Sequence, residues 1–223
     1  MQQLSPSLSG VIVGAINSNL ASIPYQAQIP NTGIYVDYRL IDVPNVSMMG
    51  IGLEHNATFF KRNSVIPFPG PVKMPVYESK GKNFELFLSE YTINTQLFAI
   101  YELGLLQTVL TKEKVKDYPM IRMDTDFIGI SIPEFRQVYK PKREVQLEIK
   151  APSRPELIIK QDDMDFNITI SMDIQVKNEE GDGFTSAVVV NFNITSDIDV
   201  SIFLNLVRLY WTVIEVTTKS NGL

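Results

Sequence analysis

The stretch Phe166-Asn167-Ile168-Thr169-Ile170-Ser171-Met172-Asp173-Ile174-Gln175-Val176 decides the fold class of this chain. Every even-numbered residue in it is apolar and every odd-numbered residue is polar. Because successive side chains of a strand point to opposite faces, the alternation predicts a long strand with one buried and one wet face. Its eleven residues span roughly 35 Å at about 3.3 Å each, which is long enough to wrap an elongated barrel.

The chain then turns and repeats the pattern. Asn178-Glu179-Glu180-Gly181-Asp182-Gly183 predicts a hairpin loop. The apolar alternation returns on even-numbered residues, namely Val188, Val190, Phe192, Ile194, Ile198, Val200, Ile202, Leu204 and Leu206. Strands of this length predict a strongly coiled antiparallel sheet.

Further strands are expected between this pair and the middle of the chain. They are Leu105 to Leu110, Met120 to Ile130, and a strand with Val145, Leu147 and Ile149 on one face. Prolines mark the connections, at Pro133, Pro141, Pro152 and Pro155. Before them, Ser89 is the expected N-cap of a helix that carries Leu97, Phe98 and Tyr101 and stops at Gly104, after a short strand from Phe84 to Leu88.

The first third of the chain predicts one helix and a small sheet. Apolar residues recur at helical steps from Ser7 to Leu20, and Pro24 blocks continuation. Ile34 to Leu40 alternates as a strand does, and Ser47 to Phe60 reads as one or two more strands. Four prolines from Pro67 to Pro75 then fix φ and remove backbone donors, so this piece is expected to be an extended connector between domains.

Composition excludes several function classes. With 223 residues, 44% of them hydrophobic, the chain can bury a sizeable core, and a net charge of −5 argues against nucleic acid as a partner. The absence of cysteine removes disulfides, thiolate metal sites and thiol nucleophiles. A single histidine, His55, and the lack of any nucleophile, zinc or phosphate-loop motif predict no enzyme, no metal site and no cofactor.

Two weaker signals concern the surface. Four N-x-S/T acceptors, at Asn45, Asn56, Asn167 and Asn193, are candidate glycosylation sites and point to the secretory pathway if they are used. Basic residues gather in two clusters, which are Lys112, Lys114 and Lys116, and then Arg136, Lys140, Lys142 and Arg143. Acidic neighbours dilute both clusters, so a solvated charged surface is favoured over contact with anionic lipid headgroups.

A set of spaced residues resembles one known family. Leu88, Ser89, Tyr91, Asn94 and Thr95, followed by Glu102, Gly104 and Leu106, have the spacing of the family of bactericidal/permeability-increasing protein, lipopolysaccharide-binding protein and the plasma lipid-transfer proteins. Phe127 to Glu134, then Pro141, Val145, Leu147 and Pro155, resemble the strand, turn and strand that follow in that family. Asn17 to Pro30 resembles the end of the long helix of its first barrel.

The resemblance implies an α+β tubular lipid-binding fold, in which a highly twisted antiparallel sheet wraps on helices and leaves an apolar slot. It implies the end of a first barrel at 1–64, a proline-rich linker at 65–82 and an incomplete second lipid-binding barrel at 83–223. The chain would thus begin inside the first barrel and stop before the second one closes. No signal peptide is predicted, since Met1 to Ser9 carries no positive charge, and the family resemblance implies an extracellular or secretory protein.

The expected function is lipid binding or transfer, with phospholipid acyl chains in an apolar groove, an innate-immune type of role and a transient contact with a membrane surface. The predicted wall residues are Leu97, Phe98, Tyr101, Leu105, Phe166, Ile168 and Ile170. The alternative is an extracellular β-rich adhesion or scaffold domain whose core is filled, because both need the same inward apolar face. An esterase is a third alternative, for which the nucleophile motif is missing.

Overall fold

The computed structural model describes residues 24–48, 50–71, 73, 85–160, 163–181, 183–203 and 206–221, with Val11, Gly14 and Ser18 as isolated helical positions. Side chains are described as far as Ser196. The rest of the helix expected over Ser7 to Leu20, and most of the proline connector beyond Pro71, lie outside the described residues. The chain divides into two compact units, Met1–Thr95 and Gln96–Leu223.

The first unit contains two small antiparallel sheets. Strands β1 (Gln26–Gln28), β2 (Ile34–Asp37) and β5 (Thr58–Lys61) pair in the order β1-β2-β5, and β3 (Asn45–Ser47) pairs with β4 (Gly50–Gly52). The strands expected after Ile34 and Ser47 are confirmed, although β2 ends at Asp37. There the buried carboxylate accepts a hydrogen bond from the Arg39 backbone N–H at 3.2 Å and pairs with the Arg39 guanidinium at 2.8 Å, which turns the chain away.

Helix α2 (Glu90–Glu102) begins and ends where its sequence predicts. The Ser89 hydroxyl accepts a hydrogen bond from the Thr92 backbone N–H at 3.2 Å, which is the N-cap interaction. Gly104 follows the helix with φ of 69°, a left-handed conformation that favours glycine. The strand expected from Phe84 to Leu88 is wrong for its described part, since residues 85–88 are irregular and Leu86 to Leu88 are exposed.

Hydroxyls of buried Thr58 and Thr95 and of half-buried Tyr91 join the start of α2 to strand β5. The Thr58 and Tyr91 hydroxyls lie 2.8 Å apart, and the Phe59 backbone N–H donates to the Thr95 hydroxyl at 3.1 Å. Thr95 in turn donates to the Thr92 carbonyl at 2.9 Å and is fully buried. Each of these polar groups is therefore paired, as burial requires.

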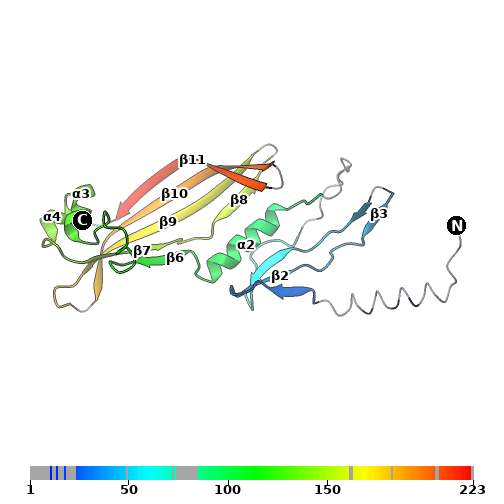
Figure 1. Cartoon of the computed structure of the whole chain (residues 1–223), viewed down its shortest axis with the longest axis horizontal. Coiled ribbons are helices and arrows are strands. Elements are labelled where there is room, and N and C mark those ends of the chain that lie inside the picture. Colours follow the sequence, from blue (N-terminus) through cyan, green and yellow to red (C-terminus); the bar gives the residue numbers. More distant parts are fainter. Residues whose placement is uncertain are drawn as a thin grey trace. The chain divides into compact units, whose positions relative to one another are not determined.

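The second unit is built on a six-stranded antiparallel sheet (Figure 1), ordered β11-β10-β9-β7-β6, with β8 also paired to β9. Its strands are β6 (Gln107–Leu110), β7 (Val145–Lys150), β8 (Glu156–Ile159), β9 (Met164–Lys177), β10 (Phe184–Phe203) and β11 (Leu206–Asn221). The α+β class and the antiparallel pairing expected from the alternation are confirmed. The long β9 and β10 and the hairpin between them are confirmed as well, with Gly181 and Gly183 in left-handed conformations.

Two strands were not anticipated. β8 follows Pro152 and Pro155, which predicted only a connection. β11 pairs back along β10, whereas the alternation from Val188 to Leu206 predicted one continuous strand. The chain reverses after Phe203, so Leu206 begins a new strand.

A bulge keeps the two longest strands in matching register. Thr185 lies opposite Val176 and Ser186 opposite Gln175, but Val188 lies opposite Ile174, so Ala187 is an extra residue. Beyond the bulge, even-numbered residues of β10 lie opposite even-numbered residues of β9. Apolar side chains thus mostly meet apolar side chains on one face, and polar ones mostly meet polar ones on the other, the exceptions being Val189 opposite Asp173 and Ser196 opposite Phe166.

The strand predicted from Met120 to Ile130 is wrong, and so is the first strand that the resemblance implied over Phe127 to Glu134, whereas its second strand, with Val145 and Leu147, is confirmed as β7. Helix α3 (Thr125–Ser131) and helix α4 (Phe135–Val138) occupy this segment. The Asp124 carboxylate caps α3 by accepting from the Phe127 backbone N–H at 2.8 Å. The apolar run was misread because its length suits either a strand or a short helix, and the cap decides between them.

Phe135 forms the centre of the core in this unit. Its fully buried ring packs with Val145, Ile174, Val176 and Val188, which share one face of the sheet. Partly buried residues surround this cluster, namely Ile128, Ile132, Tyr139, Leu147, Met172, Ala187 and Val190. The helices α3 and α4 therefore cover one end of the apolar face of the sheet.

Truncating this ring should weaken the whole unit. We expect Phe135→Ala to lower the free energy of unfolding by about 3–5 kcal/mol, because it removes apolar contacts and leaves a cavity. Val138→Ala on the same helix, where the side chain is exposed, is the matched control and should change stability by less than about 0.5 kcal/mol. Urea unfolding followed by circular dichroism measures both, and equal losses would contradict this account of the core.

Candidate functional site

The apolar face of the sheet continues beyond the part that Phe135 covers. On β9 it runs through Ile170, Ile168 and Phe166, and on β10 Phe192 and Ile194 lie opposite Ile170 and Ile168. These side chains are half-buried, whereas Ile174, Val176 and Val188 at the covered end are buried. Ile149 of β7 lies opposite Met172 on the same face and is also half-buried. We call the six half-buried residues the apolar strip, and they are Ile149, Phe166, Ile168, Ile170, Phe192 and Ile194.

The opposite face of the same strands is polar and closely hydrogen-bonded. Gln175 donates to Glu148 at 3.0 Å and to Asp173 at 2.7 Å, and it accepts from Gln146 at 2.7 Å. Ser186 donates to Asp173 at 2.6 Å. Most polar side chains thus lie on this face and most apolar ones on the other, so the face with the apolar strip is the one that offers a contact surface for an apolar ligand.

The predicted wall residues fall into two groups. Phe166, Ile168 and Ile170 lie together on one face of β9 and belong to the apolar strip. Leu97, Phe98 and Tyr101 lie on α2, where Phe98 is buried and Leu97 and Tyr101 are half-buried.

The α2 group has its own surroundings. The Tyr101 hydroxyl donates to the Pro152 carbonyl at 3.2 Å. Leu105 lies beyond the end of the helix and is exposed. The strip also contains Ile149, Phe192 and Ile194, which were not singled out as wall residues, although the even-numbered alternation of β10 already included two of them.

Two of the four glycosylation acceptors lie side by side on the polar face. Asn167 is opposite Thr195 and Asn193 is opposite Thr169. The Thr195 hydroxyl donates to the Asn167 side-chain carbonyl at 2.8 Å, and the Thr169 hydroxyl donates to that of Asn193 at 3.0 Å. Each N-x-T acceptor is thus hydrogen-bonded to the threonine of the other.

The other two acceptors lie in the first unit. Asn45 is exposed on β3. The side-chain carbonyl of Asn56 accepts a hydrogen bond from Thr58, which is buried. Their environments differ, since one is open and the other is held by its own acceptor threonine.

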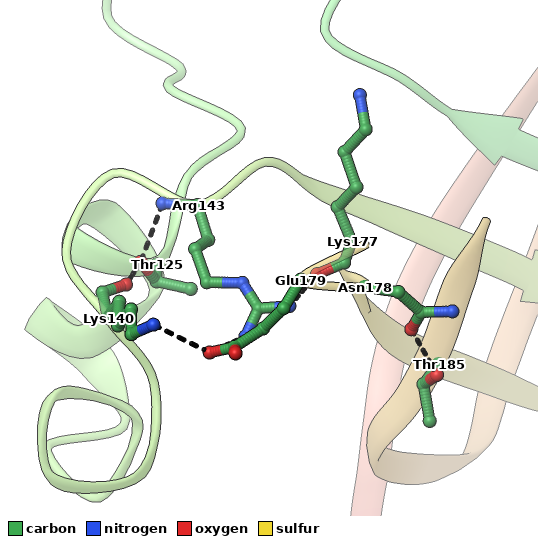
Figure 2. Close-up of polar contacts among 7 residues, drawn as sticks. All are labelled: Thr125, Lys140, Arg143, Lys177, Asn178, Glu179 and Thr185. Atoms are coloured by element: carbon green, nitrogen blue, oxygen red, sulfur yellow. Dashed lines mark hydrogen bonds and ion pairs between the residues drawn. The ribbon is translucent and has the colours of Figure 1, made fainter. Parts of the chain in front are cut away.

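Charged residues gather where the β9–β10 hairpin meets the start of β7 (Figure 2). Lys140 lies 3.0 Å from the Glu179 carboxylate, and the Arg143 guanidinium lies 3.9 Å from it and also donates to the Lys177 carbonyl. Lys177 pairs with Glu144 at 2.9 Å. The Thr125 hydroxyl accepts from the Arg143 backbone N–H at 3.2 Å and donates to the Lys140 carbonyl at 2.8 Å.

This cluster surrounds a hollow of about 330 Å³ that is open to solvent and is lined by Lys140, Arg143, Glu144, Lys177, Asn178 and Glu179. The hydrogen bond and charge of Lys140 lower the pKa of Glu179 below its ordinary value. The cations of the hollow already have acceptors, and no nucleophile lies among its lining residues. The ion pairs and hydrogen bonds around the hollow therefore hold the hairpin against the start of β7. None of the predicted wall residues lines the hollow.

Two further features bear on function. Among the residues that the structure describes, no group of three or more His, Asp and Glu side chains is placed to hold a metal ion. Within the same residues, no helix has both the length and the apolar content needed to cross a membrane.

Comparison with known proteins matches a family model and solved structures. Residues 30–218 match the model described as the LBP / BPI / CETP family, C-terminal domain. This range spans the proline-rich segment. A crystal structure of lipopolysaccharide binding protein is similar over 96% of this chain, with 12% sequence identity and a TM-score of 0.46, and this chain spans 46% of the length of that protein.

The contact between Lys140 and Glu179 predicts how the pKa of Glu179 responds to mutation. We expect the pKa of Glu179 to rise toward its ordinary value in Lys140→Gln, because the hydrogen bond and the positive charge that favour the carboxylate are gone. In the native protein the lowered pKa means that the contact stabilises the fold above the unfolded-state pKa and is lost as pH falls through the folded-state pKa. NMR titration of the Glu179 carboxyl measures the change, with Lys142→Gln as the control, and an unchanged pKa in Lys140→Gln would contradict the assignment.

Proposed function

Since the chain belongs to the LBP / BPI / CETP family, we propose that it binds lipid and that the apolar strip of its sheet is the contact surface. The observation that carries the proposal is the change along a single sheet face, where buried side chains give way to half-buried apolar ones. A filled core would have no reason to leave Ile168, Ile170 and Phe192 part-exposed beside Ile174 and Val188.

The physical basis of binding is desolvation. Burying a 14-carbon acyl chain at about 0.8 kcal/mol per methylene gives roughly 11 kcal/mol before the costs of association. No polar anchor is then needed for useful affinity. Phospholipid is the ligand class that we propose, because its acyl chains match an apolar surface that extends along a strand.

The finer organisation is part of the same proposal. We propose an elongated lipid-binding barrel in the part of the chain after the proline-rich segment, with domains at 1–64, 65–82 and 83–223. Glycosylation at Asn45, Asn56, Asn167 or Asn193 in an extracellular protein would leave the apolar strip free, because Asn167 and Asn193 lie on the opposite face of the sheet. Activity as a lipid carrier is proposed and no covalent chemistry is assigned to any residue.

A charge on the strip should remove lipid binding. We expect Ile170→Glu to take up at least about tenfold less phospholipid, because a carboxylate buried against an acyl chain is strongly penalised. The matched control is Thr169→Glu, the neighbouring residue on the polar face, which should bind lipid as the native chain does. Native mass spectrometry after incubation with phosphatidylcholine vesicles measures bound lipid directly.

Two results would oppose the proposal. Undiminished uptake by a folded Ile170→Glu protein would remove the strip from the site. A native protein that carries no lipid after expression and takes none from vesicles would favour the adhesion or scaffold alternative.

The α2 group of wall residues can be tested in the same assay. Leu97 is half-buried, so Leu97→Glu is better tolerated by the fold than a change at buried Phe98. We expect Leu97→Glu to lower phospholipid uptake if α2 contributes to the slot. Gln96→Glu, at an exposed neighbouring position, is the control, and equal uptake by the two variants would confine the site to the sheet.

A further inference from the structure

The connection between β6 and β7 differs in charge from the rest of the chain. Residues 111–144 contain eight of the 20 Lys and Arg residues of the protein and six of its 25 Asp and Glu residues. The connection is thus net positive, whereas the whole chain carries a net charge of −5. We call this segment the basic connection.

Several of its positive charges are not neutralised by a carboxylate. Lys114 donates to the Val109 carbonyl at 2.7 Å and Arg136 to the Asp126 carbonyl at 3.4 Å, both of them uncharged acceptors. Lys112 and Lys142 are exposed, and neither forms an ion pair with any residue that the structure describes. These four cations remain available to an anionic partner.

The basic connection also exposes large apolar side chains. They are Tyr118, Met120, Ile121, Ile130 and Val138. They differ in this from Val115, Met123 and Phe135 of the same connection, which are buried in the core. A segment that exposes this many large apolar side chains together with cations lacking a carboxylate partner is typical of an interaction surface.

The fold gathers these residues at one end of the sheet. β6 leaves the sheet at Leu110 and β7 returns at Val145, and α3 and α4 lie at that end in Figure 1. The Thr125 backbone N–H donates to the Arg143 carbonyl and the Val145 N–H to the Met123 carbonyl, at 2.9 and 3.0 Å. These bonds hold both ends of the helical part against β7, so it is a fixed feature of the unit.

We propose that the basic connection docks on the surface of an anionic phospholipid bilayer. Ile130 of α3 and Val138 of α4 enter the boundary between headgroups and acyl chains, while Lys112, Lys114, Arg136 and Lys142 contact the headgroups. Apolar burial and attraction to anionic lipid together account for such binding, and each Lys or Arg near the surface contributes independently of the apolar strip. The carboxylates of the connection oppose the attraction. Those of Glu113, Asp124 and Glu144 are offset by ion pairs with Lys116, Arg122 and Lys177, which leaves Asp117, Asp126 and Glu134.

Vesicle flotation tests the docking. The native chain should float with vesicles of phosphatidylcholine and phosphatidylglycerol but not with phosphatidylcholine alone, and added salt should weaken the binding. Ile130→Glu with Val138→Glu should lower the partition coefficient at least about tenfold. Lys112→Gln, Lys114→Gln and Lys142→Gln combined should lower it on the order of a hundredfold, since each cation is worth about fivefold.

The first unit supplies a matched control. Val46 and Ile51 lie opposite each other on β3 and β4 and are 72% and 70% exposed, against 63% for Ile130 and 60% for Val138. Val46→Glu with Ile51→Glu should leave flotation unchanged. An equal loss in both double variants, or equal flotation with both kinds of vesicle, would overturn the proposal.

Docking and lipid uptake can be separated. Flotation reports the bilayer surface, whereas bound lipid in native mass spectrometry reports the apolar strip. Ile130→Glu with Val138→Glu should still retain lipid acquired during expression. If this double variant no longer floats but still carries lipid, docking by this surface is supported. If the native chain floats with anionic vesicles but carries no lipid, docking stands and the proposed function is opposed.

Discussion

The burial of Phe135 against one end of the sheet is the interaction on which the second unit depends. A long alternating strand presents apolar side chains to a single face, and that face needs a cover wherever it is not in contact with a ligand. The short helix α4 supplies this cover with one aromatic ring, placed over Val145, Ile174, Val176 and Val188. Where the ring ends, the side chains of the same face become half-buried.

The remaining contacts hold that arrangement in place. The Asp124 cap fixes the start of α3, and the Thr125 hydroxyl joins Lys140 to Arg143 at the entry to β7. Exposed ion pairs such as Lys140 with Glu179 add little to stability, because solvent screens them and side-chain entropy opposes them. Their effect is positional, since they set the hairpin beside the helices. Helices α3 and α4 thus cover one end of the apolar face of the sheet, and the apolar strip beyond them stays accessible.

Much of the fold follows from the sequence, and what was missed has physical reasons. Strand alternation located β9 and β10, and Ser89 and Gly104 bounded α2, because these signals depend on neighbouring residues alone. α3 was missed because a short apolar run suits a strand as well as a helix. β8 was missed because Pro152 and Pro155, which suggested a connection, lie just before its paired residues. β11 was missed because apolar residues continue at even positions through the turn after Phe203, so the alternation does not show where the chain changes direction. The site was predictable as one face of β9, but how far Phe135 covers that face depends on packing between distant segments.

The bulge at Ala187 has a consequence for how this sequence can change in length. Losing or gaining one residue elsewhere in the paired part of β9 or β10 would turn every following side chain to the other face, and would mix isoleucine with asparagine on both. At Ala187 the strand already holds one unpaired residue, so a single codon could be lost there while Val188 stayed opposite Ile174. We expect tolerated single-codon deletions in this hairpin to concentrate at the bulge and in the loop from Asn178 to Gly183.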